Sequence, residues 1–205
     1  SVRLELAETI ARVPPPDRIT SEGLERTEAD LRRALGIVEG LLTDSGQVPR
    51  YRQSTARILE RLAGVEWMRR GPEPATASMR RAWNLYSGLA DGQPTVPEYG
   101  LTALRVGIQF GDLLAWQEEW IESGRVFQEC ERRVETIAPE EFGEWGWNET
   151  QQRIANGLAR ATEALLRTPP NNSFRQGPDG PPGPRPPGPR PPGPRPPGGP
   201  PRNRG

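Results

Sequence analysis

Apolar side chains recur every three or four residues along the first 167 positions, which is the spacing of one face of an α-helix. Prolines and glycines divide this pattern into pieces of helical length. No comparable stretch alternates between apolar and polar residues, as a half-buried strand would. The predicted helical segments are 2–13, 21–43, 51–70, 74–89, 98–122, 125–137 and 148–167. We therefore expect an all-α fold with almost no strand.

Several segment boundaries carry recognisable signals. Thr20 and Ser21 are plausible N-caps for segment 21–43, because a hydroxyl oxygen can accept a bond from the first free N–H groups. Asn148 can cap the last segment, with Gln151 returning the bond. Gly124 is expected to separate the fifth segment from the sixth. The stretch EEFGEWGW between the last two segments is expected to be a loop or a short turn.

The chain contains an internal repeat. VPRY at 48–51 and VPEY at 96–99 are 48 positions apart. The preceding segments match at the same offset: Ala29 with Ala77, Leu31 with Met79, Arg32-Arg33-Ala34 with Arg80-Arg81-Ala82, and Leu41 with Leu89. A period near 48 residues indicates a pair of helices that stacks on the next pair.

The helix pairs resemble tetratricopeptide-type repeats. The apolar and small positions of that motif are matched by Leu59, Leu62 and Ala63 in one helix and by Ala75, Met79 and Ala82 in the next. MRRAWNLYSGLADGQPTVPEY is similar to degenerate repeats of bacterial multi-repeat proteins, some of which are fused to serine/threonine kinases. Two departures are Gly71, one position late in the turn, and Glu66, where an aromatic residue is usual.

This resemblance implies a short right-handed α-solenoid of antiparallel helix hairpins over residues 1–167. Its repeat units would be about 21–50, 51–98 and 99–138, with helix 148–167 as a cap. The function expected of such a fold is that of a non-catalytic protein–protein interaction scaffold. The scaffold could form the C-terminal part of a larger regulatory protein such as a kinase fusion.

Composition excludes several kinds of chemistry. The chain has no histidine, and all 27 of its basic residues are arginines. Without lysine there is no Walker P-loop and no Schiff base, and without histidine there is no Ser-His-Asp triad and no ordinary zinc site. The single cysteine, Cys130, is expected to be a small apolar residue in a helix. We predict no catalytic residue, no metal and no cofactor, and therefore no enzyme.

Charge divides the chain in two. Residues 1–167 carry 21 basic and 26 acidic side chains, whereas 168–205 carry six and one, so a body of net charge −5 is joined to a tail of +5. The tail contains PPGPR repeats and is expected to be a disordered polyproline II segment. Its glycines are five positions apart, which excludes a collagen helix, and neither Src-homology-3 register is met. The repeat is similar to peptides read by GYF-type domains.

The tail opens a second functional hypothesis. Arg185, Arg190 and Arg195 could bind an acidic surface, so that the chain is a structural or envelope-associated protein tethered electrostatically by its tail. Otherwise the tail is a spacer. An acidic body gives no basic face for specific nucleic-acid binding.

Candidate partner-binding residues fall into two groups. The polar side chains expected on the concave face of the stack are Arg52, Thr55, Arg105 and Gln109. Trp145 and Trp147 either cover the end of the stack or form an aromatic docking site. Trp116 and Trp120, four residues apart, are expected to pack in the core or between helices.

A protein or peptide partner is expected, and the oligomeric state is left open. No run of about eighteen apolar residues exists, so no membrane span is predicted in this chain. A cytoplasmic location is favoured, and an extracytoplasmic one stays open if an anchor or signal peptide preceded Ser1.

Overall fold

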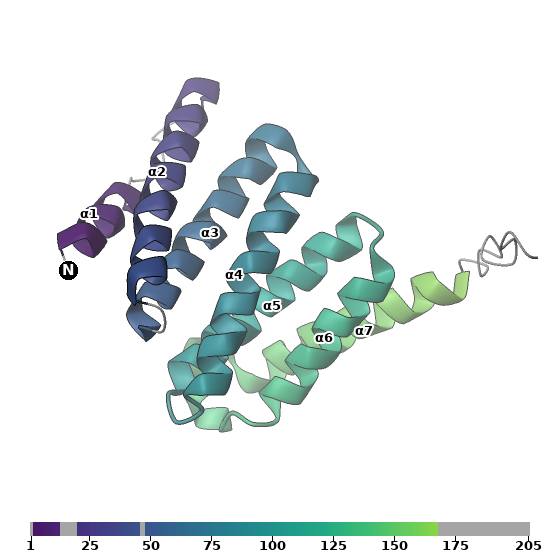
Figure 1. Cartoon of the computed structure of the whole chain (residues 1–205). Coiled ribbons are helices and arrows are strands. Elements are labelled where there is room, and N and C mark those ends of the chain that lie inside the picture. Colours follow the sequence, from purple (N-terminus) through teal and green to yellow (C-terminus); the bar gives the residue numbers. More distant parts are fainter. Residues whose placement is uncertain (1, 13–19, 46–47, 168–205) are drawn as a thin grey trace, which may run out of the picture. The chain divides into compact units, whose positions relative to one another are not determined.

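The computed structural model describes residues 2–12, 20–45 and 48–167. They form α1 (Val2–Ala11), α2 (Ser21–Ser45), α3 (Pro49–Arg70), α4 (Pro72–Gly92), α5 (Pro97–Trp116), α6 (Trp120–Val134), a 3-10 helix η1 (Pro139–Trp145) and α7 (Trp147–Arg167) (Figure 1). The all-α prediction is confirmed, since the described residues contain no strand. One compact unit spans Ser1–Pro169; the second, Pro170–Gly205, holds the predicted tail and lies outside the described residues.

Three α-helices, α3, α4 and α5, begin on a proline, as does the 3-10 helix η1. Proline suits the first helical position because its fixed φ is helical and its missing N–H would have had no partner there. In the two repeated motifs the preceding valine has extended backbone, and the chain turns directly into α3 and α5. The N–H of Tyr51 donates to the carbonyl of Val48 over 3.0 Å, and that of Tyr99 to Val96 over 3.1 Å. The repeated VPRY and VPEY are therefore helix-start signals.

The break between α5 and α6 differs from the prediction. It lies at residues 117–119, where Glu118 adopts a positive φ of 62°, and α6 begins at Trp120 rather than at 125. Gly124 lies inside α6, where a Cβ would be 3.6 Å from the Cβ of Ala161 on α7. The expectation that Gly124 separates the two helices is wrong, because the position lies where α6 approaches α7.

The helix ends give one confirmed cap and one correction. Thr20 caps α2, since its Oγ1 accepts a bond from the N–H of Gly23 over 3.1 Å. Asn148 does not cap α7, which begins one residue earlier, after Gly146 with its φ of +63°. The stretch predicted as a loop or short turn forms η1, and it buries Phe142 to 4 % exposure.

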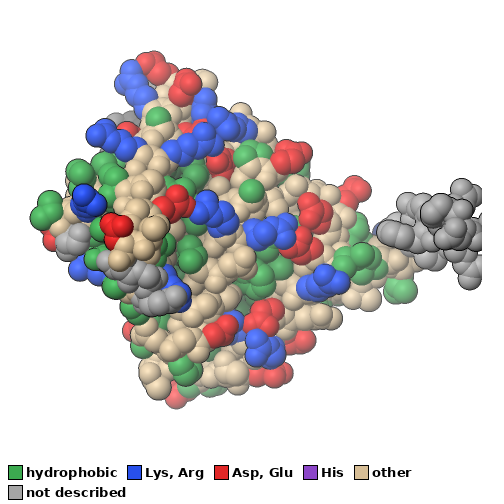
Figure 2. Space-filling model, in the orientation of Figure 1, with side chains coloured by type: hydrophobic (Ala, Val, Ile, Leu, Met, Phe, Trp, Pro, Cys, Tyr) green, Lys and Arg blue, Asp and Glu red, His purple; other side chains and the backbone are tan. Residues whose placement is uncertain are grey.

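Each α-helix contacts the next one in the chain, and polar side chains also join alternate helices. One set of bridges links α1, α3, α5 and α7, and a second links α2, α4 and α6. The first set is Ser54 to Glu8, Arg105 to Glu60 and Arg160 to Asp112; the second is Arg81 to Glu39, Arg80 to Glu122 and Arg133 to Asp91. Figure 2 shows basic and acidic side chains interspersed over the visible face, as such pairing requires.

Two hydrophobic clusters fill the interior of the described helices. The first draws on α1 to α5 and includes Leu31, Ala34, Leu59 and Ala82. The second draws on α5, α6, η1 and α7. Among the described residues, every member of both clusters lies between Leu4 and Leu158, so a chain that ends at Arg167 retains all of these core residues.

Candidate functional site

A groove of about 520 Å³ runs between α3 and α5, with α4 as its floor. Its lining residues are Glu60, Ala63, Gly64 and Trp67 from α3, Ala75 and Met79 from α4, and Gln109, Asp112, Leu113 and Trp116 from α5. We call it the tryptophan groove. Three of its lining residues, Ala63, Gly64 and Ala75, are small, and Ala63 and Ala75 are almost fully buried.

Trp67 and Trp116 form an edge-to-face pair at one end of this groove. Their ring centroids are 4.7 Å apart at an interplanar angle of 70°. Each lies in the last turn of its helix, and they are 38 % and 63 % exposed. Large aromatic rings that remain exposed in a groove are typical of interaction sites, where they bury much area at a low entropy cost.

Ion pairs fix the walls of the groove. Arg105 on α5 donates two hydrogen bonds to the carboxylate of Glu60 on α3, one of them over 2.9 Å. This bonding to Glu60 raises the pKa of Arg105, so the guanidinium stays charged. At the other wall, Asp112 accepts a bond from Arg160 of α7 over 2.5 Å. The groove is therefore preformed, which lowers the entropy cost of binding.

Three acidic residues lie close in sequence to residues that line the groove. Glu118 and Glu119 come two and three positions after Trp116, and Glu73 lies in the first turn of α4, two positions before Ala75. The side chain of Gln117 donates to Thr76 and so holds the end of α5 against that turn. All three carboxylates are exposed, and none forms an ion pair with another described residue. We call these three residues the acidic rim.

The predicted concave-face residues have different surroundings. Gln109 is exposed and lines the groove, and Arg105 braces it through Glu60. Thr55 is 1 % exposed, and its hydroxyl donates to the carbonyl of Tyr51 over 2.8 Å, so it faces its own helix. Arg52 is half-buried and engaged with a neighbour.

Of the predicted aromatic and tail residues, the structure describes the side chain of Trp147 alone. Trp147 is half-buried and packs edge-to-face on Phe142, with ring centroids 5.0 Å apart. Trp145 ends η1, but its side chain is outside the described residues, as are Arg185, Arg190 and Arg195. Among the predicted residues with described side chains, Gln109 lines the groove and Arg105 braces its wall.

Sequence reasoning missed the tryptophan pair. Trp116 was expected to pack in the core or between helices; it does contact Trp67 of a neighbouring helix, but 63 % of it stays exposed. The sequence did contain a signal for this pair. The 48-residue repeat relates α3 to α5, and a shift of 48 positions moves Trp67 to within one position of Trp116. Equivalent ends of two repeated helices therefore both carry an indole ring.

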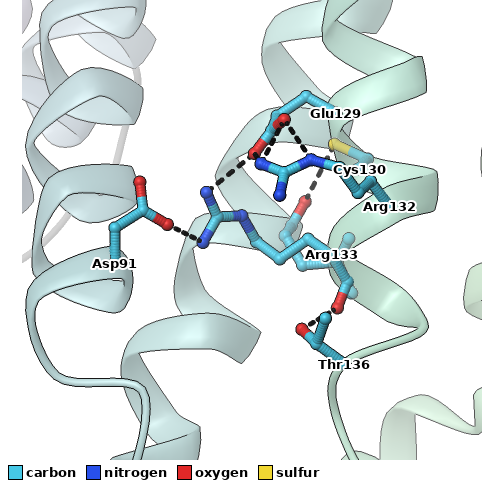
Figure 3. Close-up of polar contacts among 7 residues, drawn as sticks. Asp91, Glu129, Cys130, Arg132, Arg133 and Thr136 are labelled. Carbon is cyan, nitrogen blue, oxygen red and sulfur yellow. Dashed lines mark hydrogen bonds and ion pairs between the residues drawn. The ribbon is translucent and has the colours of Figure 1, made fainter.

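A second cavity of about 420 Å³ lies beside the α4–α5 turn and the end of α6. Figure 3 shows its polar network: buried Arg133 donates to Asp91 over 3.0 Å and to Glu129 over 2.9 Å, and Arg132 donates to the same Glu129 over 2.6 Å. Within this network the two arginines balance the two carboxylates, and Glu141 also lines the cavity. The network joins α4 to α6 and is structural.

Cys130 has the inert character expected of it. The side chain is 1 % exposed, and burial raises the pKa of its thiol to about 12. A thiolate is the reactive form of cysteine, so this residue is a poor nucleophile near neutral pH. Within the described ranges no cluster of three or more carboxylate or thiol ligands could hold a metal ion, and no helix is long and apolar enough to cross a membrane.

No protein-family model matches the chain, and no curated protein matches it either. Among solved structures, the chain is similar to the "DHF79 filament", at 20 % identity and a TM-score of 0.41, over 81 % of this chain and 86 % of that one. A likeness of that degree carries no information about function.

Proposed function

We propose that this chain is a non-catalytic protein–protein interaction scaffold of the tetratricopeptide kind, which binds an extended peptide in the tryptophan groove. The observation that carries the proposal is the exposed pair of Trp67 and Trp116 in a groove whose walls are fixed by ion pairs. Aromatic anchors in a preformed groove are the usual source of affinity in peptide recognition.

A right-handed solenoid is the architecture that we propose for the body. The 48-residue repeat supports it, since Ala34 and Ala82 are equivalent in the repeat and both fully buried. Side-chain bridges between alternate helices also support it, because stacked hairpins contact their neighbours in this way. Most exposed positions of α7 are polar, including Gln152 and Asn156, as a terminal cap requires, whereas Leu165 and Leu166 near its end are exposed apolar residues.

The proposed binding mode follows from the lining residues. An apolar peptide side chain would lie against the faces of Trp67 and Trp116, over the floor of Ala75 and Met79. The amide of Gln109 could bond the peptide backbone at the groove wall. A cation next to the apolar anchor would meet the acidic rim.

Photo-crosslinking of the full-length chain tests the site. A photoreactive amino acid at Gln109 should capture a discrete partner, whereas the same group at Gln152, exposed on α7, should not. The captured partner should then bind the Trp116→Ala variant about 30-fold more weakly, because a central aromatic anchor is worth about 2 kcal/mol or more. The matched control is Leu166→Ala, which removes an exposed apolar side chain outside the groove. Equal capture at both positions, or equal affinity of both variants, would exclude the groove as the binding site.

A further inference from the structure

Another cavity, of about 500 Å³, lies between α5 and α7. Its lining residues are Asp112 from α5 and Arg153, Asn156, Ala159, Arg160 and Glu163 from α7. We call it the arginine cavity. Asp112 also lines the tryptophan groove, so the two cavities adjoin at this side chain. An extended ligand in the groove can therefore continue past Asp112 into the arginine cavity.

The charges around Asp112 are unbalanced. Its Oδ1 atom accepts a bond from Arg160 over 2.5 Å, and its Oδ2 atom is 3.7 Å from Arg153, which is longer than a hydrogen bond. Within the described ranges, neither arginine has a further ion-pair partner. Glu163 is paired with Arg167 over 2.6 Å. Two guanidinium groups thus share one carboxylate, and one positive charge has no carboxylate of its own.

The hydrogen-bond donors of the arginine cavity are accessible to a ligand. The side chains of Arg153 and Arg160 are 47 % and 55 % exposed, and each guanidinium has several N–H donors. Asn156 lies between them on the same face of α7. Its carbonyl oxygen accepts a bond from Gln152 over 2.9 Å, which leaves its NH₂ group to donate. A carboxylate is well suited to bind such a set of donors.

A single negative charge fits this cavity better than a double one. A carboxylate matches the one guanidinium charge that lacks a partner. A phosphate group carries a charge of about −1.5 to −2 and would lie beside the carboxylates of Asp112 and Glu163, which repel it. The ligand group that the charges favour is therefore a carboxylate.

We propose that the arginine cavity binds an aspartate or glutamate side chain of the peptide whose apolar anchor lies in the tryptophan groove. The inference rests on the proposed function for the anchor and adds a second contact point. The axes of packed helices such as α5 and α7 are about 8 to 10 Å apart, and an extended peptide advances about 3.3 Å per residue. The acidic residue should therefore lie about three positions from the anchor.

Synthetic peptides test the acidic position by fluorescence anisotropy with the full chain. Each peptide is capped at both ends and carries a dye without a carboxylate, so that glutamate supplies the only negative charge. One contains Leu-Ser-Ser-Glu, one has glutamine in place of glutamate, and one contains Leu-Glu-Ser-Ser. Each is also made in reverse order, because a peptide can cross α5 in either direction. In one of the two directions, we expect the first peptide to bind about fivefold more tightly than the other two.

Variants of the chain assign the two contacts separately. In the Arg153→Gln, Arg160→Gln double variant, the glutamate and glutamine peptides should bind equally well. The double variant should fold, because exposed ion pairs contribute little to stability. Trp116→Ala should weaken both peptides by a similar factor, since it removes only the anchor. The matched control is Arg125→Gln on α6, which removes an exposed arginine that lines neither cavity and should leave the preference for glutamate intact.

Several results would overturn the inference. Equal binding of the glutamate and glutamine peptides would show that no carboxylate is recognised, and equal binding at both spacings would indicate unspecific attraction. A preference for glutamate that survives in the double arginine variant would place the carboxylate elsewhere. Tighter binding of a peptide that ends in a free carboxylate at the glutamate position would assign the cavity to a chain terminus.

The absence of any peptide binding at millimolar concentration would also overturn the inference. The proposed function is decided independently by the crosslinking experiment. If the partner captured at Gln109 still depends on Trp116 while the peptides show no preference for glutamate, the tryptophan groove remains the binding site and only the acidic contact is wrong.

Discussion

The two halves of the described body pack their helices through different interactions, charged in one half and apolar in the other. Where α2, α3 and α4 meet, buried carboxylates bind arginines and a hydroxyl. Where α5, α6 and α7 meet, a phenylalanine ring fills a notch left by glycines. The first junction depends on matched charge, and the second depends on missing side-chain atoms.

Glu66 is the centre of the charged junction. It is 4 % exposed, and its carboxylate accepts a bond from Arg32 over 3.0 Å and one from the hydroxyl of Ser78 over 2.6 Å. Arg32 also pairs with Glu28 over 2.7 Å, and Glu28 is 2 % exposed. One arginine thus joins carboxylates from α2 and α3, while Ser78 adds α4. Because hydrogen bonds to charged groups are directional, such a junction selects which helices pack together by bond geometry as well as by shape.

Phe127 is the centre of the apolar junction. It is fully buried, and a Cβ added to Gly157 on α7 would lie 2.4 Å from its ring, while one added to Gly111 on α5 would lie 2.8 Å away. Ser123, one turn earlier on α6, donates to the carbonyl of Gly111 over 2.9 Å and holds the two helices at this distance. The helices approach closely because two Cβ atoms are absent.

The largest expected effect is at the apolar junction. Phe127→Ala should lower the free energy of unfolding by about 4 kcal/mol, because it removes a fully buried ring and leaves a cavity between three helices. Urea denaturation followed by circular dichroism measures the change. The control is Leu166→Ala, whose side chain is 82 % exposed and whose loss should have little effect. A small loss for Phe127→Ala would mean that α7 does not depend on this contact.

Removal of the Glu66 side chain should lower the free energy of unfolding by somewhat less than removal of Phe127 does. Glu66→Ala should lower the free energy of unfolding by about 3 kcal/mol, because Arg32 and Ser78 lose a buried partner. The matched control is Glu163→Ala, which breaks the exposed pair with Arg167 and should leave stability unchanged. If both variants unfold at the same urea concentration, the charged junction contributes no more than a surface pair.

The glycines allow a test in which two Gly→Ala substitutions are expected to change stability in opposite directions. Gly157→Ala should destabilise by about 2 kcal/mol, since the added Cβ must displace the ring of Phe127. Gly36→Ala, inside α2 with nothing within 4 Å of the added Cβ, should instead stabilise by about 0.5 to 1 kcal/mol through helix propensity. Thermal melts of both variants measure the two shifts. Shifts of equal sign would show that the notch does not restrict the helix approach.

The smallest effect concerns Tyr86, which belongs to the cluster built on α1 to α5. Burial, followed by the charge of Glu60, raises the pKa of its hydroxyl from 10.0 to about 12, against the opposing effect of Arg57 and Arg105. A raised folded-state pKa means that this stabilisation is complete below pH 10 and is lost as pH rises towards 12. Stability of the parent should fall by about 1 kcal/mol more than that of Tyr86→Phe between pH 9 and pH 11.

Unfolding curves at the two pH values give this difference directly. No lysine titrates in this alkaline range, because the chain contains none. Cys130 is present in both proteins, so its titration cancels when their stabilities are compared. Identical pH dependence in Tyr86→Phe and the parent would show that Tyr86 does not titrate abnormally.

Much of the fold could be read from the sequence because it depends on local periodicity. Every predicted helical segment corresponds to a helix, and the valine-proline motifs mark where α3 and α5 begin. The α5–α6 boundary could not be read, since Gly124 is a packing residue and the turn residue is Glu118. The sequence does not distinguish a glycine that ends a helix from a glycine that leaves room for a neighbouring aromatic ring.

The candidate site was only partly visible. Gln109 and Arg105 could be chosen as polar positions on one helix, because helical spacing decides which side chains share a face. Arg105 pairs with Glu60, which lies 45 positions earlier in the chain, and this ion pair joins α5 to α3. No local sequence pattern indicates such a pair. Trp116 was assigned to packing because a large apolar residue is usually buried, yet 63 % of it is exposed.

The sequence by itself determined the helices, their repeat, the lack of lysine and histidine chemistry, and the division of charge between body and tail. These properties depend on composition and on neighbours within a few positions. Only the tertiary structure decided that Glu66 is a buried partner of Arg32, that Gly157 accommodates Phe127, and that Trp67 and Trp116 meet at the surface. Each of these contacts joins residues at least 30 positions apart, so it forms only when whole helices pack against one another.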